Sequence, residues 1–255
     1  MDFLDYNKTI RIQNYAVDSK TLILAAIKAN EYLCNLTALF KEIDFDIFTA
    51  LGQRNISGFI GEIYKHILSG LCPALVANPH PDGRPDIIIL DDATATNYYQ
   101  NCFQVVNGRK VPIKSLFAPF KYEGIEIKCS IGSSGKASTQ AFSDRFGHSF
   151  SLYDSRVGYL NGITWWAHHS SSTNLMGLYY DYYANKEGIP QILGAFYSPL
   201  NGSDWNAVSH GDPNHKKTSN TSLNKEGLLK MKNNCIFLIN DSQYIQQMRK
   251  IGVPI

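Results

Sequence analysis

The chain has 255 residues, 44% of them hydrophobic and 18% charged, so it can bury a core without staples, and disorder over its whole length is excluded. A net charge of +2 is too small to identify a partner by itself. Five cysteines without a Cys-x-x-Cys pair indicate reduced thiols, and they support neither a disulfide framework nor a zinc ribbon.

The first residues are acidic and lack the basic-then-apolar layout of a signal peptide. The longest apolar stretches, such as residues 21–27, are much shorter than a membrane span. No internal repeat or long linker divides the chain. We therefore expect a cytoplasmic protein that does not associate with membranes and forms a single domain over residues 1–255.

The N-terminal part is predicted to be helical. Over residues 18–51 the apolar side chains recur every three or four positions, as on the buried face of a helix, and Asp18 or Ser19 can cap its start. A second helix is predicted over residues 57–68, and Gly70 ends it. These helices would precede a core that spans about residues 57–200.

Strands are predicted to follow. A turn-rich passage leads into residues 86–90, which are short and β-branched and predict a buried strand. The next stretch, residues 91–122, has no clean period and predicts short strands or a hairpin. Later elements are predicted as strands at 124–129, 163–168, 175–183, 191–197 and 235–239, and a closing helix at 242–250. Helices that lead into strands predict a mixed α/β domain.

Two acids and a lysine lie on the predicted core strands. Asp86 follows Pro85 where a turn enters one strand, and a later strand carries Glu126 and Lys128. Because side chains alternate along a strand, Glu126 and Lys128 project to the same side. If the two strands are neighbours, Asp86 and Glu126 converge on one divalent cation beside Lys128. Glu62, on the preceding helix, is a third acid for the same site.

Each of these groups has a chemical role to offer. Two carboxylates with water suit Mg²⁺, which prefers oxygen ligands, binds a phosphate oxygen and lowers the pKa of a bound water. Lys128, protonated beside two acids, can hold the attacking water and stabilise developing charge. The alternative is that Asp86 caps a turn, while Glu126 and Lys128 form a solvated pair on an edge strand.

The same residues resemble a known family. Asp86, Glu126 and Lys128 resemble the motif of the PD-(D/E)xK nuclease superfamily, and the length and setting resemble its type II restriction endonucleases. Glu62 occupies the place of an acid often found on the family's preceding helix. The match covers residues 57–139, about a third of the chain. The resemblance implies a central mixed sheet flanked by helices, Mg²⁺-dependent cleavage of phosphodiester bonds in double-stranded DNA, and a homodimer on a symmetric site.

The chain departs from the family pattern in one respect. Asp86 and Glu126 are 40 positions apart, which is longer than the tight hairpin of many members. An inserted hairpin or a DNA-contacting loop would account for the difference.

A polar, glycine-rich segment follows Lys128. Its spacing fails the phosphate-loop pattern, so we expect no nucleotide cofactor. Its small and cationic side chains suit contact with a DNA backbone, and an ordinary surface loop explains the composition equally well. The residues that would touch DNA here are Ser130, Ser133, Ser134 and Lys136.

Two further regions are predicted to meet DNA. Arg145 and His148 lie just beyond this segment, and the polar stretch 201–224 includes His215, Lys216 and Lys217. Such side chains can hydrogen-bond to base edges and phosphates, although plain solvent exposure explains the same composition.

The sequence thus favours a magnesium-dependent, sequence-specific endonuclease of the type II restriction class. A DNA repair or structure-selective nuclease is an alternative within the same chemistry. A noncatalytic nucleic-acid-binding protein is an alternative of another class, and it would place Asp86, Glu126 and Lys128 far apart.

Overall fold

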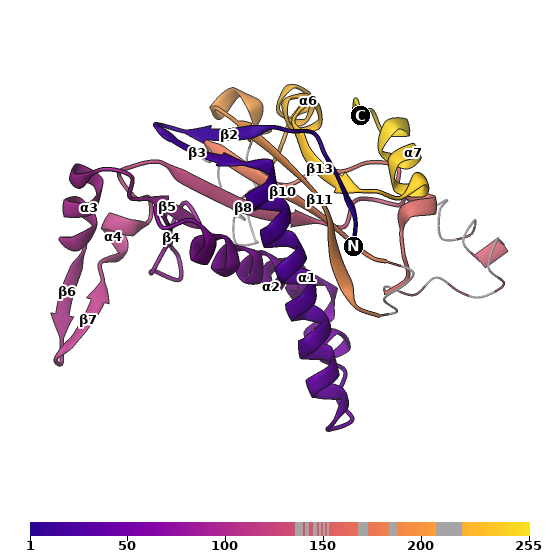
Figure 1. Cartoon of the computed structure of the whole chain (residues 1–255), viewed down its shortest axis with the longest axis horizontal. Helices are drawn as coiled ribbons and strands as arrows, with labels where there is room; N and C mark the ends of the chain where they lie inside the picture. Colours follow the sequence, from indigo (N-terminus) through magenta and orange to yellow (C-terminus); the bar gives the residue numbers. More distant parts are fainter. Residues whose placement is uncertain are drawn as a thin grey trace, which may run out of the picture.

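The computed structural model describes residues 1–135, 140, 143–144, 147, 149, 151, 153–167, 173–183, 188–207 and 221–255, without the side chains of residues 53 and 54. Within these residues, seven strands form one mixed sheet in the order β1-β13-β11-β10-β8-β5-β4 (Figure 1). The strands are β1 (Phe3–Asp5), β4 (Leu75–Ala77), β5 (Ile87–Ile89), β8 (Gly124–Ser130), β10 (Asn174–Tyr182), β11 (Pro190–Pro199) and β13 (Cys235–Ile239). Only β8 and β10 are parallel neighbours.

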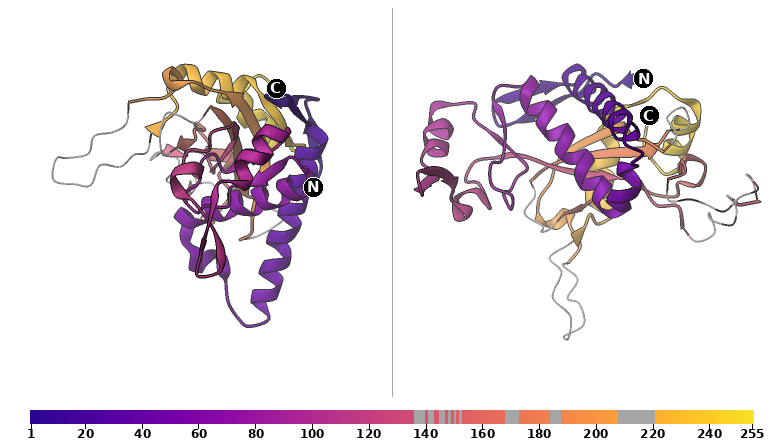
Figure 2. Two further views of the ribbon diagram at one scale, coloured as in Figure 1. Left: turned by 90° about the vertical axis from the view of Figure 1, so that its left-hand side faces the viewer. Right: turned by 90° about the horizontal axis from the view of Figure 1, so that it is seen from below.

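Helices cover both faces of the sheet, as two of the views show (Figures 1 and 2). The helices are α1 (Ser19–Lys41) and α2 (Ile47–Leu71) on one face, and α6 (Lys225–Asn233) and α7 (Ser242–Lys250) on the other. Consecutive residues of β10 serve opposite faces, so Leu178 packs with α1 and α2 while Tyr179 packs with α7. The predicted mixed α/β fold, a central mixed sheet flanked by helices, is confirmed.

The first predicted helix begins correctly but does not reach residue 51. The Asp18 carboxylate accepts a hydrogen bond from the Thr21 N–H at 2.7 Å and caps α1, which ends at Lys41. A turn then leads to Asp46, which caps the next helix. This second helix, α2, includes the predicted 57–68 segment and is kinked at Gly52, where φ is 65°. A local turn therefore interrupts an apolar pattern that is periodic in sequence.

Most of the predicted strands are confirmed, namely β5, β8, β10, β11 and β13, together with the closing helix α7. Of the predicted strand 163–168, the described residues contain only β9 (Trp166–Ala167), which pairs with β12 (Thr221–Ser222). Sequence reasoning missed β1, β4, α6 and the hairpin of β2 (Thr9–Ile12) and β3 (Tyr15–Asp18). These elements are short, and most of them carry too few apolar residues to show a period.

Residues 91–122 form a separate projection, which we call the arm (Figure 1, left). It contains α3 (Ala93–Gln100), the hairpin of β6 (Phe103–Val106) and β7 (Arg109–Pro112), and α4 (Lys114–Phe117). The predicted hairpin is therefore present, and α3 was not predicted. An aromatic cluster fills the arm and includes Ile88 of β5, so the arm is packed onto the sheet.

All five cysteines are free thiols, as the sequence predicted. Among the described helices, none combines the length and the apolar composition that crossing a membrane requires.

Candidate active site

The strand that carries Glu126 and Lys128 lies inside the sheet. Strand β8 pairs with β5 on one side and β10 on the other, so its residues are not on a sheet edge. Ile125 and Ile127 point into the core with α2, which directs Glu126 and Lys128 to the opposite side. Only 4% of Glu126 is exposed. The alternative of a solvated pair on an edge strand is therefore wrong.

Asp86 joins this pair through the geometry of the neighbouring strand. The paired part of β5 begins at Ile87, which lies opposite Ile125 of β8. Just before it, the Asp86 Oδ2 atom accepts a hydrogen bond from the Ile127 N–H at 2.7 Å and so continues the ladder with a side chain. The same oxygen lies 3.1 Å from Lys128 Nζ, and Lys128 Nζ lies 2.7 Å from Glu126 Oε1. The three predicted groups, which we call the triad, thus meet around one ammonium group.

Burial and neighbouring charges shift the pKa values of Glu126 and Lys128. Burial raises the pKa of Glu126, the Lys128 charge opposes this rise, and the Asp86 charge adds to it. Burial alone would lower the pKa of Lys128, but the Asp86 and Glu126 carboxylates outweigh that effect and raise it. Lys128 is therefore held as a cation, and one cation is shared between two acids.

A hollow of about 330 Å³ is lined by Glu126, and two further hollows are lined by both Asp86 and Lys128. The larger of these two has a volume of about 560 Å³ and is lined by the segment from Pro81 to Arg84, by Lys114 of the arm, and by all three triad residues. The smaller, of about 330 Å³, lies beside α2 and shares Asp86 and Lys128 with the larger one. A ligand in either hollow would touch charged groups of both signs.

Glu62 lines both the larger and the smaller hollow but does not contact the triad. Its carboxylate forms an ion pair with Lys65 at 2.5 Å, and 65% of its side chain is exposed. Helix α2 approaches β8 closely at Gly61, where a Cβ atom would lie 3.4 Å from the Cys129 sulfur, whereas a Cβ atom at Gly58 would meet nothing within 4 Å. Of these two glycines of α2, only Gly61 lies at the close approach to β8.

The donor set fits a magnesium ion. Asp86 Oδ1 and Glu126 Oε2 have no hydrogen-bond partner among the described residues, so each carboxylate keeps a free oxygen toward a ligand. No group of three or more His, Cys, Asp or Glu side chains in the described part of the chain is arranged for a metal. Two carboxylates suffice for Mg²⁺, which usually completes its shell with water and phosphate.

The other predicted contacts with DNA are placed only in part. Ser130 ends β8, and its hydroxyl accepts a hydrogen bond from the Gly132 N–H at 3.1 Å. The Ser133 hydroxyl donates to Asn161 at 2.7 Å, which fastens the segment after β8, and Ser134 follows it half-buried. None of the three lines the hollows of the triad. The rest lie outside the described residues: Lys136, Arg145, His148, His215, Lys216 and Lys217.

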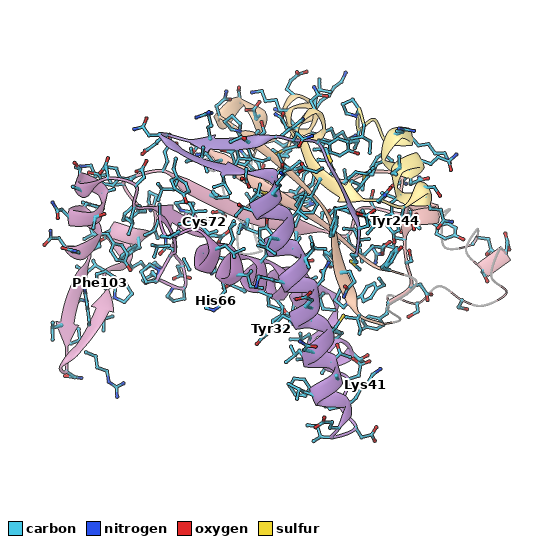
Figure 3. All side chains as sticks on the ribbon, in the orientation of Figure 1. Tyr32, Lys41, His66, Cys72, Phe103 and Tyr244 are labelled. Atoms are coloured by element: carbon cyan, nitrogen blue, oxygen red, sulfur yellow. The ribbon has the colours of Figure 1, made fainter. Side chains whose placement is uncertain are left out.

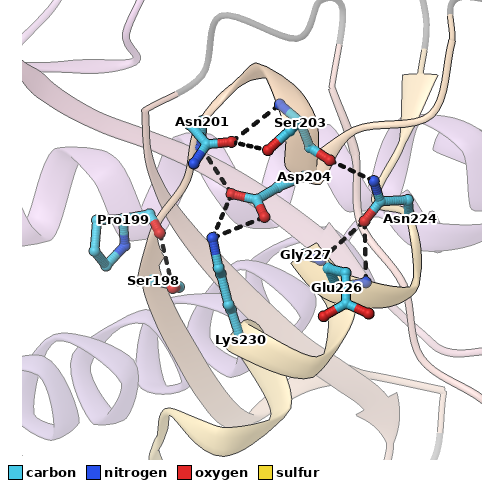
Figure 4. Close-up of polar contacts among 9 residues, drawn as sticks. All are labelled: Ser198, Pro199, Asn201, Ser203, Asp204, Asn224, Glu226, Gly227 and Lys230. Atoms are coloured by element: carbon cyan, nitrogen blue, oxygen red, sulfur yellow. Dashed lines mark hydrogen bonds and ion pairs between the residues drawn. The ribbon is translucent and has the colours of Figure 1, made fainter.

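The two ends of the polar stretch 201–224 are described, and they are tightly bonded (Figure 4). Asp204 is buried, accepts a hydrogen bond from the Asn201 N–H at 2.8 Å, and pairs with Lys230 of α6 at 2.8 Å. The Asn224 side chain caps α6 and donates to the Ser203 carbonyl at 2.6 Å. The ends of this stretch are thus anchored to α6, and its middle, residues 208–220, lies outside the described part.

Sequence reasoning missed three residues near the triad. Arg84 lines the larger hollow, and its charge helps to lower the pKa of Glu126. Its position two residues before Asp86 was the available signal. Lys114 reaches the same hollow from the arm, and Trp166, 59% exposed, lines the smaller one. Nothing in the sequence pattern links these two residues to the triad, because they come from distant segments.

Comparison with known proteins gives no match to any family model, any curated protein or any solved structure.

Proposed function

We propose that this protein is a magnesium-dependent endonuclease that cleaves phosphodiester bonds of double-stranded DNA at specific sites, with the chemistry of the PD-(D/E)xK superfamily and a type II restriction role. The observation that carries the proposal is the contact of Asp86, Glu126 and Lys128 around one ammonium group on two neighbouring strands. Acids and a lysine with shifted pKa values at the wall of a hollow are typical of catalytic sites, which favours an enzyme over a noncatalytic protein.

In this proposal Asp86 and Glu126 hold the metal through their free oxygens. Bound Mg²⁺ would neutralise charge on a phosphate oxygen and lower the pKa of a bound water. Lys128, kept protonated by the two acids, holds the attacking water and stabilises the charge that develops on the phosphate. Arg84, on the wall of the larger hollow, adds a second positive charge for the DNA backbone.

The proposed partners follow from the substrate. A homodimer would place two triads on the two strands of a symmetric DNA site. A restriction enzyme would work in the cytoplasm, where foreign DNA arrives. A repair nuclease that selects branched or mismatched DNA uses the same triad and is the competing proposal.

The test is incubation of the full chain with plasmid and phage DNA in Mg²⁺, in EDTA, and in Ca²⁺ as a matched non-cleaving cation. Discrete fragments that require Mg²⁺ would support a restriction role. Cutting confined to branched or mismatched duplexes would favour the repair nuclease. DNA that stays intact in Mg²⁺ at all concentrations of protein would contradict both nuclease proposals.

A further inference from the structure

The arm has a packed aromatic core of its own and continues into β5 and β8, the strands beside the triad. Phe103 lies at the base of the hairpin (labelled in Figure 3). It packs edge-on against Tyr99 and Phe117, with ring centroids 5.1 and 5.3 Å apart. The cluster reaches Ile88 of β5, two residues after Asp86. A binding element with its own core presents side chains in a fixed geometry and loses little entropy on binding.

The hairpin end of the arm is basic, although the arm begins with Asp91 and Asp92. The twenty residues from Phe103 to Tyr122 contain four lysines or arginines and no acid, whereas the whole chain carries a net charge of only +2. Lys114 of this segment lines the larger hollow beside the triad. Lys114 is paired there with Asp82 at 2.6 Å, whereas Arg109, Lys110 and Lys121 form no ion pair within the described part of the chain. The hairpin end of the arm therefore carries the positive charge that binding to a polyanion requires.

The hairpin is a short two-stranded ribbon with a defined turn. Asn107 and Gly108 both have positive φ, 49° and 74°, as the tight two-residue turns of β-hairpins require. Val106 pairs with Arg109, and Gln104 pairs with Val111. Since paired residues share a face of the ribbon, Gln104 and Arg109 lie on the same face.

This face is free to bind. Gln104 and Arg109 are exposed, and neither side chain has a hydrogen-bond or ion-pair partner within the described part of the chain. Val106, between them on the ribbon, is 44% exposed. On the opposite face Lys110 lies 4.4 Å from the centroid of the Phe103 ring, which holds its side chain against the arm.

We propose that the β6–β7 hairpin enters the major groove of DNA and reads base edges with Gln104 and Arg109. A two-stranded ribbon fits the width of that groove, glutamine pairs bidentately with adenine, and arginine pairs with guanine. Val106 offers the apolar contact that a thymine methyl group accepts. The inference rests on the proposed function for its substrate, and it assigns sequence readout to a part of the chain distinct from the triad.

The test measures binding apart from cleavage. The wild type, Arg109→Ala and Gln104→Ala select duplexes from a library with a randomised centre, with Ca²⁺ in place of Mg²⁺. Arg11→Ala is the matched control, because Arg11 is an exposed arginine on the other hairpin, β2–β3. We expect Arg109→Ala to lose a guanine preference and Gln104→Ala an adenine preference, each with affinity for the selected site falling about ten- to a hundredfold.

Each outcome separates the two proposals. If the wild type binds and selects DNA but does not cut it in Mg²⁺, the nuclease proposal fails and the hairpin is still judged by its variants. If the wild type cuts discrete sites and both hairpin variants select the same sequences with the same affinity as Arg11→Ala, the hairpin proposal is wrong. An equal loss of affinity on all sequences would show contact with the backbone and would also contradict base readout.

Discussion

Two acid–lysine clusters in this molecule use the same chemical groups and reach opposite protonation behaviour. In one, burial acts to raise the pKa of Asp204, but the hydrogen bond and charge of Lys230 together with the Asn201 backbone N–H outweigh burial, so the pKa of Asp204 is lowered. In the other, Asp86 and Glu126 share Lys128, and burial raises the pKa of Glu126.

The two clusters differ in the number of acids that share one lysine. One acid and one lysine make a closed, neutral pair that anchors the start of a polar stretch to α6 (Figure 4). Two acids and one lysine leave a net negative charge and free carboxylate oxygens at a hollow. The first arrangement has no net charge to compensate, whereas a bound cation would compensate the net negative charge of the second.

The largest expected effect is on DNA cleavage, which should depend on the triad and not on the pair of Asp204 and Lys230. Asp86→Ala and Lys128→Ala should each lower the rate of DNA cleavage in Mg²⁺ about a thousandfold or more, because one removes a metal ligand and the other removes the charge beside the phosphate. DNA binding in Ca²⁺ should be largely kept. Asp204→Asn is the control and should cleave at the wild-type rate at a temperature where it is folded. Full activity in either triad variant would reject the assignment.

The second effect is on stability and its pH dependence. Lys128→Met leaves the buried Glu126 beside Asp86 without a cation and should lower the free energy of unfolding by about 3 kcal/mol at pH 8. Because the pKa of Glu126 is already raised and rises further without Lys128, protonation favours the folded variant. The difference in the free energy of unfolding between the wild type and Lys128→Met should therefore shrink as the pH falls, beginning above the ordinary glutamate value of about 4.3.

Lys230→Met is the matched comparison for this measurement. It should cost about 1 kcal/mol, since Lys230 is partly exposed and Asp204 keeps its backbone donor. In the wild type, the lowered pKa means that ionised Asp204 contributes stability that is lost only as the pH falls below the ordinary aspartate value of about 3.9, and Lys230→Met removes two of the interactions that lower this pKa. Urea denaturation of the wild type and both variants, over a working range of about pH 4 to about pH 8, measures the free energy of unfolding. A loss of stability that depends on pH in the same way in both variants would contradict the prediction.

The smallest effect concerns the cation itself. Calorimetric titration with Mn²⁺ in the absence of DNA should detect binding to the wild type, and Glu126→Gln should weaken it about tenfold or more. Affinity should fall on acidification above the ordinary glutamate range, because the raised pKa of Glu126 makes protons compete earlier. Asp204→Asn should bind as the wild type does, and equal binding by Glu126→Gln would remove Glu126 from the site.

The sequence predicted the parts of the molecule that local patterns determine. Alternation along residues 124–129 correctly gave the faces of Glu126 and Lys128, and the Asp18 cap gave the start of α1. The contact with Asp86 depended on which strands are neighbours, and the pattern could state this only as a condition.

The parts that escaped prediction depend on tertiary structure. Lys114 and Trp166 reach the hollows because the arm and β9 fold back toward the triad, and no spacing in the sequence reports such an approach. The end of α1 was missed because an isolated turn at Asp44, with φ of 54°, interrupts a continuous apolar period.

The covalent attachment of the arm connects the two proposed sites. Its two ends continue into β5 and β8, the strands that hold Asp86 and Glu126. The proposed DNA contact of the hairpin and the proposed metal site are therefore connected through one pair of neighbouring strands.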